Sequence, residues 1–147
     1  MVKLTKDFIK DNVLNFLRIS IGVIYVWFGA LKFFPSLSPA ELLAEETIEL
    51  LLFNQVEGHI LILGLAGWEV LLGIGLLINY KLRLLIPIMF VHMLCTVVPA
   101  IVAPDYVFTL FPFGLTLVGQ YIVKNFVFVT SALLLLKYTD APSVKEA

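Results

Sequence analysis

Three ionisable side chains, Glu69, His92 and Lys124, each lie near the middle of a different apolar segment long enough to cross a bilayer. An ionisable group at the centre of a membrane helix costs roughly 2.5–3.5 kcal/mol, so it normally faces a partner or a cavity. Three such groups at similar depth predict one polar site inside a helix bundle. There Glu69 could exchange protons, while His92 and Lys124 could donate hydrogen bonds. We take these three residues as the candidate catalytic residues.

Four apolar segments carry these residues: 13–34, 59–80, 82–103 and 114–137. Each has about 20 residues or slightly more, which at about 1.5 Å rise per residue spans a hydrocarbon core near 30 Å. Open strands would leave backbone groups unpaired in lipid, and the segments lack the alternation of a membrane barrel. The sequence therefore predicts an all-α, integral membrane four-helix bundle, formed as a single domain over residues 1–147.

The composition separates this chain from ordinary soluble domains. Of its 147 residues 61% are hydrophobic and 14% are charged, and the mean hydropathy is +1.01. Apolar residues make up only about half of a typical soluble chain, so the expected environment is a lipid bilayer. The net charge of −1 and the lack of a basic face argue against nucleic acid as a partner. The single cysteine, Cys95, excludes an internal disulfide and a thiol-exchange pair.

The distribution of charge predicts the orientation in the membrane. Loops on the cytoplasmic side of membrane proteins carry an excess of Lys and Arg. Basic residues gather before or at the start of the first segment, between the second and third, and after the fourth, whereas the first long loop is rich in glutamate. We therefore expect both termini in the cytoplasm, an uncleaved first helix and two loops on the outer side.

Both outer loops are predicted to be structured. The segment Ser38-Pro39-Ala40-Glu41 has the features of a helix start, with Ser as N-cap, Pro at the first helical position and Glu closing a capping box. A short amphipathic helix is therefore expected over about residues 39–53, either along the membrane surface or across the mouth of the bundle. The second loop, residues 99–112, is apolar and is interrupted by three prolines, which favours a packed cap or lid.

In the first segment, one helical face carries Arg18, Gly22, Tyr25, Gly29 and Lys32, at spacings of four, three, four and three. Two interpretations are open. The glycines could form a groove for close helix packing, with the two basic side chains reaching opposite interfaces. Alternatively, this face is one wall of an interior cavity with the Tyr25 hydroxyl at its centre. In that case Arg18, Tyr25 and Lys32 are candidate ligand-binding residues.

Glu69 and Lys124 also admit a structural and a functional interpretation. They could form an ion pair that only fixes the register of two helices, or they could act on a bound molecule. Lys124 lies too deep to reach either interface easily, so it needs a counter-charge, hydrogen-bond acceptors or water. Gln120, one turn closer to the outer side of the same helix, is a further candidate ligand-binding residue.

Trp27 and Trp68 lie within the spans rather than in the interfacial belts where tryptophan usually concentrates. We expect both to pack inside the bundle. The alternative is an aromatic wall for a flat ring such as a quinone, with Trp68 as a candidate binding residue.

His92 is expected to be either a hydrogen-bonded packing residue or a contact to a ligand. Haem ligation by His59 and His92 is not expected, because about 10 residues of helix, roughly 15 Å, separate them along the membrane normal. The sequence also lacks a Cys/His cluster of the kind that holds zinc or iron–sulfur centres. We therefore expect no haem and no metal site.

Three segments resemble the DoxX-like family of small four-span bacterial membrane proteins. They are LRI at residues 17–19 running into WFGALKF at 27–33, GWEV at 67–70 with Gly73, and GQYIVKN at 119–125. The last two are most similar to the RclC-like branch of that family. The resemblance implies a four-helix bundle in the bacterial cytoplasmic membrane. It also implies a link to respiratory or redox chemistry, since some relatives belong to thiosulfate:quinone oxidoreductase or quinol oxidase systems.

The resemblance carries five polar positions over to this chain, and these are Arg18, Lys32, Glu69, Gln120 and Lys124. Two hypotheses of function follow. In the first, the protein is a redox-associated subunit that binds a quinone or similar small amphiphile between its helices. In the second, it is a non-catalytic accessory or assembly subunit of a larger membrane complex, with other membrane subunits or further copies of itself as partners. A small transporter fits less well, because four helices usually need oligomerisation to enclose a pathway.

Overall fold

The computed structural model describes residues 2–35, 37–38, 41–51 and 57–139. Within these ranges, four stretches of helix are long and apolar enough to cross a membrane. They are formed by α1 (Val2–Leu31), α3 (Gly58–Leu77), α4 (Leu82–Cys95) continued by α5 (Pro99–Val102), and α7 (Leu117–Thr139). The predicted all-α four-helix membrane bundle is confirmed, and the protein crosses the membrane several times.

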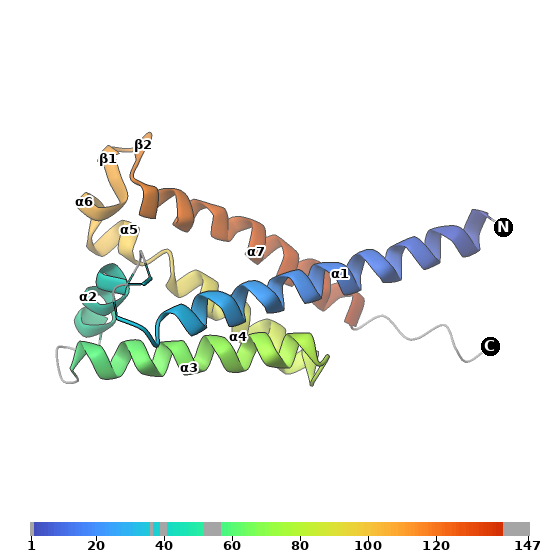
Figure 1. Ribbon diagram of the computed structural model, residues 1–147. Helices are drawn as coiled ribbons and strands as arrows, with labels where there is room; N and C mark the ends of the chain where they lie inside the picture. The colour runs from blue at the N-terminus through green and yellow to red at the C-terminus, as the bar shows by residue number, and fades with distance from the viewer. Residues whose placement is uncertain (1, 36, 39–40, 52–56, 140–147) are drawn as a thin grey trace.

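The bundle has two distinct ends (Figure 1). At the first, which we call the turn end, residues 78–81 join α3 to α4, and α1 begins and α7 ends on the same side. At the second, which we call the capped end, lie α2 (Glu41–Leu51), α5, α6 (Pro104–Val107) and a two-stranded hairpin. The predicted orientation would put the turn end in the cytoplasm. The first turns of α1 project beyond the other helices there (Figure 1).

The ends of the first two spans differ from the prediction. The first membrane span covers Asn12–Leu31, so its start agrees with the prediction to within one residue, although α1 itself begins earlier, at Val2. The span ends at Leu31 instead of residue 34, where hydrogen bonds from the next residues to carbonyls three positions back tighten the last turn. α3 ends at Leu77 instead of residue 80. The reason is that Asn79 and Lys81 adopt left-handed backbone conformations, with φ of 60° and 40°, which a helix cannot continue through.

The third predicted span, residues 82–103, is interrupted. α4 ends at Cys95, a turn of three residues follows, and Pro99 opens α5. Pro99 has no N–H to donate to the carbonyl of Cys95, so it breaks the helical ladder and starts a new helix instead. The Thr96 hydroxyl donates a hydrogen bond of 2.6 Å to the Met93 carbonyl oxygen within this turn.

The hairpin pairs β1 (Phe108–Leu110) with β2 (Gly114–Leu115) in antiparallel fashion. The sequence analysis did not anticipate it and placed the start of the last span at residue 114. The helix begins at Leu117 instead, because the Thr116 hydroxyl accepts a hydrogen bond from the Gly119 backbone N–H at 3.0 Å. This bond satisfies one of the free N–H groups in the first turn, so Thr116 is the N-cap of α7.

Glycines bring α1 and α3 into close contact. A Cβ atom on Gly73 would lie 2.7 Å from the Val26 backbone nitrogen and 2.8 Å from the Gly22 carbonyl oxygen. A Cβ on Gly29 would lie 3.0 Å from the Val70 backbone nitrogen. Backbone atoms cannot move aside as a flexible side chain can, so only glycine allows this approach. The glycine groove proposed for the first segment is confirmed.

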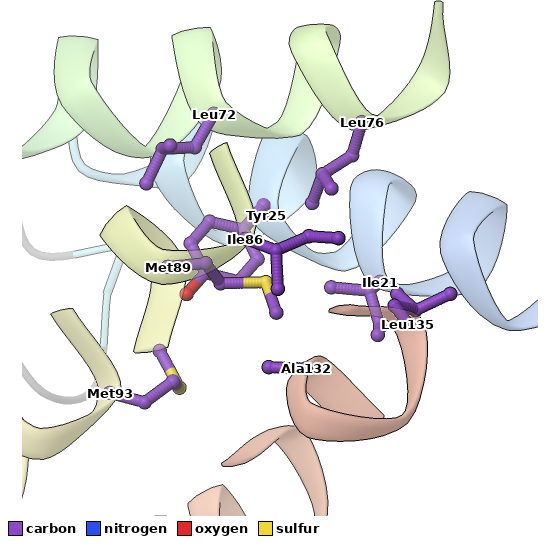
Figure 2. Packing of buried hydrophobic residues seen from close by; sticks show 9 residues of the cluster. All are labelled: Ile21, Tyr25, Leu72, Leu76, Ile86, Met89, Met93, Ala132 and Leu135. Atoms are coloured by element: carbon purple, nitrogen blue, oxygen red, sulfur yellow. The ribbon is translucent and has the colours of Figure 1, made fainter. Parts of the chain in front are cut away.

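The main hydrophobic core lies in the half of the bundle nearer the turn end. All four long helices contribute to it, and their buried side chains point toward one another (Figure 2). Its buried members are Ile21, Tyr25, Leu72, Leu76, Ile86, Met89, Met93, Ala132 and Leu135. The core therefore holds the four helices together near the turn end and leaves the half nearer the capped end to other side chains.

The capped end is closed by packed segments. α2 was predicted over about residues 39–53; it spans Glu41–Leu51, and residues 39, 40, 52 and 53 lie outside the described ranges. Leu43 of α2, Val107 of α6 and Ile122 of α7 form a second buried cluster. The second loop therefore packs onto the bundle through Val107, as a cap would, although Ile101, Leu110 and Phe111 are exposed.

Candidate functional site

A cavity of about 460 Å³ lies between the long helices and α2, toward the capped end. Its volume falls within the roughly 300–1,000 Å³ of typical small-molecule sites. α1 and α7 separate toward this end of the bundle (Figure 1). The floor is shared with the core, because Tyr25 and Met93 belong to both. The polar or titratable side chains in its largely apolar wall are Tyr25, Lys32, Ser38, Thr47, Glu69, His92, Cys95, Thr96, Tyr121, Lys124 and Asn125.

An ion pair in the cavity wall joins α1 to α3. Lys32 Nζ lies 2.5 Å from Glu69 Oε2, and the two side chains are only 9% and 10% exposed. Lys32 follows the last residue of α1, and side chains there lean back toward the N-terminus of the helix. The Lys32 side chain therefore runs back along α1, and its ammonium group lies 3.5 Å from the Phe28 carbonyl oxygen. Gly29 leaves room for the Glu69 side chain to approach. The interpretation in which Lys32 reaches the outer interface is therefore wrong.

Two further side chains extend this ion pair across the cavity floor. His92 Nε2 lies 3.6 Å from Glu69 Oε1, and the Tyr25 hydroxyl lies 3.3 Å from His92 Nδ1. The Tyr25 and His92 rings also meet edge to face, with 5.7 Å between their centroids. Lys32, Glu69, His92 and Tyr25 thus form a continuous series of contacts across three helices, which we call the polar chain.

The polar chain is suited to holding and moving a proton. A neutral imidazole donates from one ring nitrogen and accepts at the other. When Nε2–H of His92 faces Glu69, Nδ1 accepts from the Tyr25 hydroxyl; the other tautomer reverses both roles. The 3.6 Å separation between His92 and Glu69 exceeds a hydrogen bond, so transfer requires the carboxylate to approach the ring by a few tenths of an ångström.

Lys124 lines the same cavity from α7 but does not pair with Glu69, whose partner is Lys32. Its ammonium nitrogen lies 5.0 Å from the centroid of the Tyr121 ring. A cation–π contact contributes about 0.5–2 kcal/mol, less than the roughly 2.5–3.5 kcal/mol that a lysine costs at the centre of a membrane helix. Within the described ranges, no carboxylate forms an ion pair with Lys124. The interpretation of Glu69 and Lys124 as an ion pair is wrong.

A hydrogen-bonded pair that the sequence analysis did not select also lines the cavity. The Asn125 side-chain amide donates a hydrogen bond of 2.7 Å to the Thr96 hydroxyl, which ties α7 to the turn after α4. The sequence did contain a signal for both residues. Thr96 lies one helical turn after His92, and Asn125 directly follows Lys124, so each adjoins a residue that was selected.

Three predicted residues lie away from the cavity wall. Trp27 and Trp68 are 67% and 44% exposed, so the expectation that they pack inside the bundle is wrong. Neither they nor Gln120, which is exposed, line the cavity. The outer surface of a membrane bundle is itself apolar, so a large apolar side chain within a span does not indicate burial. Trp68 and Gln120 are therefore removed from the set of cavity residues.

Arg18 has a structural position at the turn end. It is only 8% exposed, and its Nη1 donates to the carbonyl oxygens of Leu76 and, at 2.9 Å, Leu77. These carbonyls end α3 and have no partner within that helix, although the Asn79 backbone N–H beyond its end also donates to the Leu76 oxygen. Arg18 thus caps α3 from α1 and places positive charge at the negative end of its dipole. Arg18 does not line the cavity, so its interpretation as a ligand-binding residue there is wrong.

The fold and the cavity define an integral membrane four-helix bundle with an internal polar site. Comparison with known protein families, with curated proteins and with solved structures found no match. The resemblance to the DoxX-like family therefore stays a prediction. In the described ranges, no three His, Cys, Asp or Glu side chains gather closely enough to hold a metal ion.

Proposed function

We propose that the protein is a redox-associated membrane subunit that holds a quinone, or a similar small amphiphile, in this cavity. The observation that carries the proposal is the position of the polar chain in the wall of a largely apolar cavity of about 460 Å³. A ring with two carbonyl oxygens and an alkyl tail matches such a mixture of surfaces. The bacterial cytoplasmic membrane is the proposed location, on the strength of the family resemblance.

The polar chain supplies what a quinone head group requires. Lys32 and the Tyr25 hydroxyl can donate hydrogen bonds to carbonyl oxygens, while Glu69 and His92 can exchange protons with them. Apolar side chains of α1, α2 and α7 line the rest of the cavity and could contact the alkyl tail; they include Phe28, Ile48 and Phe128. Electrons would have to come from a partner, so the proposal concerns binding and proton exchange.

Organic extraction of the purified protein, followed by mass spectrometry, tests this proposal. We expect a quinone or a related amphiphile in near-equal molar ratio to the wild-type chain. Replacing Glu69 by Gln should reduce the recovered amount by roughly tenfold, because a charge-assisted contact is lost. Glu57→Gln is the matched control, since Glu57 is exposed and lies outside the cavity. Recovery of no amphiphile, or equal recovery from both variants, would count against the proposal.

A second candidate function, that of an accessory subunit in a larger membrane complex, is favoured by the outer face of α3. A Cβ atom on Gly64 or Gly67 would meet no other atom within 4 Å. Glycines on an open helix face allow a neighbouring helix to pack closely. Native purification of the wild type and of Gly64→Leu tests this function. A partner in fixed stoichiometry that is lost from the variant would support it, and its retention would contradict it.

A further inference from the structure

The charges in the cavity wall do not cancel. Among the described residues that line it, two carry ammonium groups, Lys32 and Lys124, and one carries a carboxylate, Glu69. The contact of 2.5 Å between Lys32 and Glu69 pairs one ammonium with the only carboxylate. With the imidazole of His92 neutral, one positive charge, that of Lys124, is left uncompensated.

The position of Lys124 makes this excess charge significant. Lys124 is the eighth residue of α7, so helical rise places it about 10 Å from the N-terminal start of that helix. Among the described residues, the face of the Tyr121 ring lies over its ammonium nitrogen, and this face carries only a partial negative charge. Lys124 lines the cavity but is itself exposed, so in a bilayer it also faces the opening of the cavity. A lysine at this depth needs either an anion or water, and the cavity wall beside it is largely apolar.

We propose that the ligand of this cavity is an amphiphile with a singly charged anionic head group, and that Lys124 is the residue that pairs with it. This inference rests on the proposed function, because it assumes that the cavity binds an amphiphile. The chemistry is that of a carboxylate or a phosphodiester, from a free fatty carboxylate or from the head group of an anionic lipid. A single negative charge matches the single uncompensated ammonium group.

The neighbours of Lys124 fit such a head group. Asn125 lines the cavity and donates one N–H of its amide to the Thr96 hydroxyl, which leaves a second N–H for an oxygen of the ligand. A carboxylate bound here would lie on the α7 side of the cavity, and Lys32 already shields the negative charge of Glu69 on the opposite wall. The polar chain carries no net charge, because its ammonium and carboxylate groups pair, whereas the α7 side of the cavity carries the positive charge of Lys124. The two sides therefore present different chemistry to a ligand.

Equilibrium binding of four probes to the purified full-length protein, in phosphatidylcholine nanodiscs at mildly alkaline pH, tests the inference. The probes are dodecanoate, lauroyl lysophosphatidylglycerol, dodecanol and decyl-benzoquinone. We expect at least one of the two anionic probes to bind roughly tenfold more tightly than dodecanol. The anionic probe that binds more tightly identifies the source of the head group.

Variants locate the effect at Lys124. Lys124→Met should weaken binding of the anionic probe by roughly tenfold and leave dodecanol within about threefold of the wild type. Lys124→Arg keeps the charge and should retain the preference. Lys137→Met, in the last turn of the same helix and outside the cavity, is the control and should change nothing. If Lys124 were only structural, Lys124→Met would lower the melting temperature, whereas we expect it unchanged or raised.

The outcomes separate this inference from the proposed function. Binding of decyl-benzoquinone without any preference for an anionic probe would overturn the inference and leave the proposed function standing. Anionic binding that depends on Lys124, without binding of decyl-benzoquinone, would support the inference and reject quinone as the ligand. If no probe binds, both fail. A preference for the anionic probe that survives in Lys124→Met would also overturn the inference.

Discussion

Lys32 Nζ and Glu69 Oε2 lie 2.5 Å apart, although Lys32 follows the last residue of α1 and Glu69 lies near the middle of α3. The lysine side chain runs back along its own helix toward the centre of the bundle, and Gly29 lets the two helices approach. This ion pair fixes the polar chain in place, because the second carboxylate oxygen of Glu69 is then directed to His92.

Removing Lys32 should therefore be costly. Lys32→Met leaves the Glu69 carboxylate buried without its cation, and we expect the free energy of unfolding to fall by about 3–5 kcal/mol. The double variant Lys32→Met/Glu69→Gln should recover a large part of this loss, because no charge is then left unpaired. Equilibrium unfolding in mixed micelles measures both. A double variant that is less stable than Lys32→Met alone would contradict the importance of the pair.

The glycine contact between α1 and α3 gives a second prediction with a matched control. Gly73→Ala places a Cβ atom 2.7 Å from the Val26 backbone nitrogen, so the helices must separate, at a cost of about 1–3 kcal/mol. Gly67→Ala meets nothing within 4 Å, and higher helix propensity should make it neutral or up to about 1 kcal/mol stabilising. The same unfolding experiment compares them. Equal effects would show that α1 and α3 do not meet at Gly73.

Arg18 tests the distinction between a capping residue and a ligand contact. Arg18→Gln removes a donor from the carbonyl oxygens of Leu76 and Leu77. Leu76 keeps the Asn79 backbone N–H, so the loss falls on the Leu77 acceptor, and leaving such an acceptor unpaired costs about 1–3 kcal/mol. We expect lower stability with unchanged affinity for decyl-benzoquinone. Affinity is measured at a temperature where the variant is still fully folded. A loss of affinity under these conditions would place Arg18 at the binding site.

A hydrogen bond at the capped end predicts a pH dependence. The Tyr106 hydroxyl donates to Glu46 Oε1 at 3.0 Å, and this bond and the negative charge of Glu46 raise the pKa of the Tyr106 phenol above its ordinary value of 10.0. A pKa raised by folding adds stability that is present below the unfolded-state pKa and is lost as pH rises through the folded-state value.

We therefore expect the melting temperature of the wild type to exceed that of Tyr106→Phe below pH of about 10, and the difference to shrink at higher pH. The effect should be small, because both groups are exposed. Melting curves of the two proteins across this range provide the measurement. A difference that does not change with pH would show that this hydrogen bond does not link α2 to α6 in solution.

The number and type of the membrane helices could be predicted from the sequence, because length and hydrophobicity alone decide whether a segment spans a bilayer. The approximate position of α2 could also be predicted, since Ser38 and Glu41 mark a helix start. The interior positions of Tyr25, Glu69 and His92 follow from the cost of polar groups in lipid. These inferences need no knowledge of how one helix lies against another.

The pairing of polar residues could not be predicted in the same way. The choice of Lys32 over Lys124 as the partner of Glu69 depends on which helices are neighbours and how they are rotated. Helices that are apolar on all sides carry little information on either point. The same reason explains the wrong expectation for Trp27 and Trp68, because lipid and protein interior are equally apolar surroundings.

Saturation binding of decyl-benzoquinone to the purified protein in nanodiscs tests most directly whether the polar chain lies in a ligand cavity. Ala44 lines the cavity from α2, whereas Leu42, on the same helix, is 70% exposed and lies outside it. We predict saturable binding to one site per chain, abolished by Ala44→Trp, which fills the cavity, and unchanged by Leu42→Trp. Non-saturable binding, or equal affinity in the folded Ala44→Trp variant, would contradict the account.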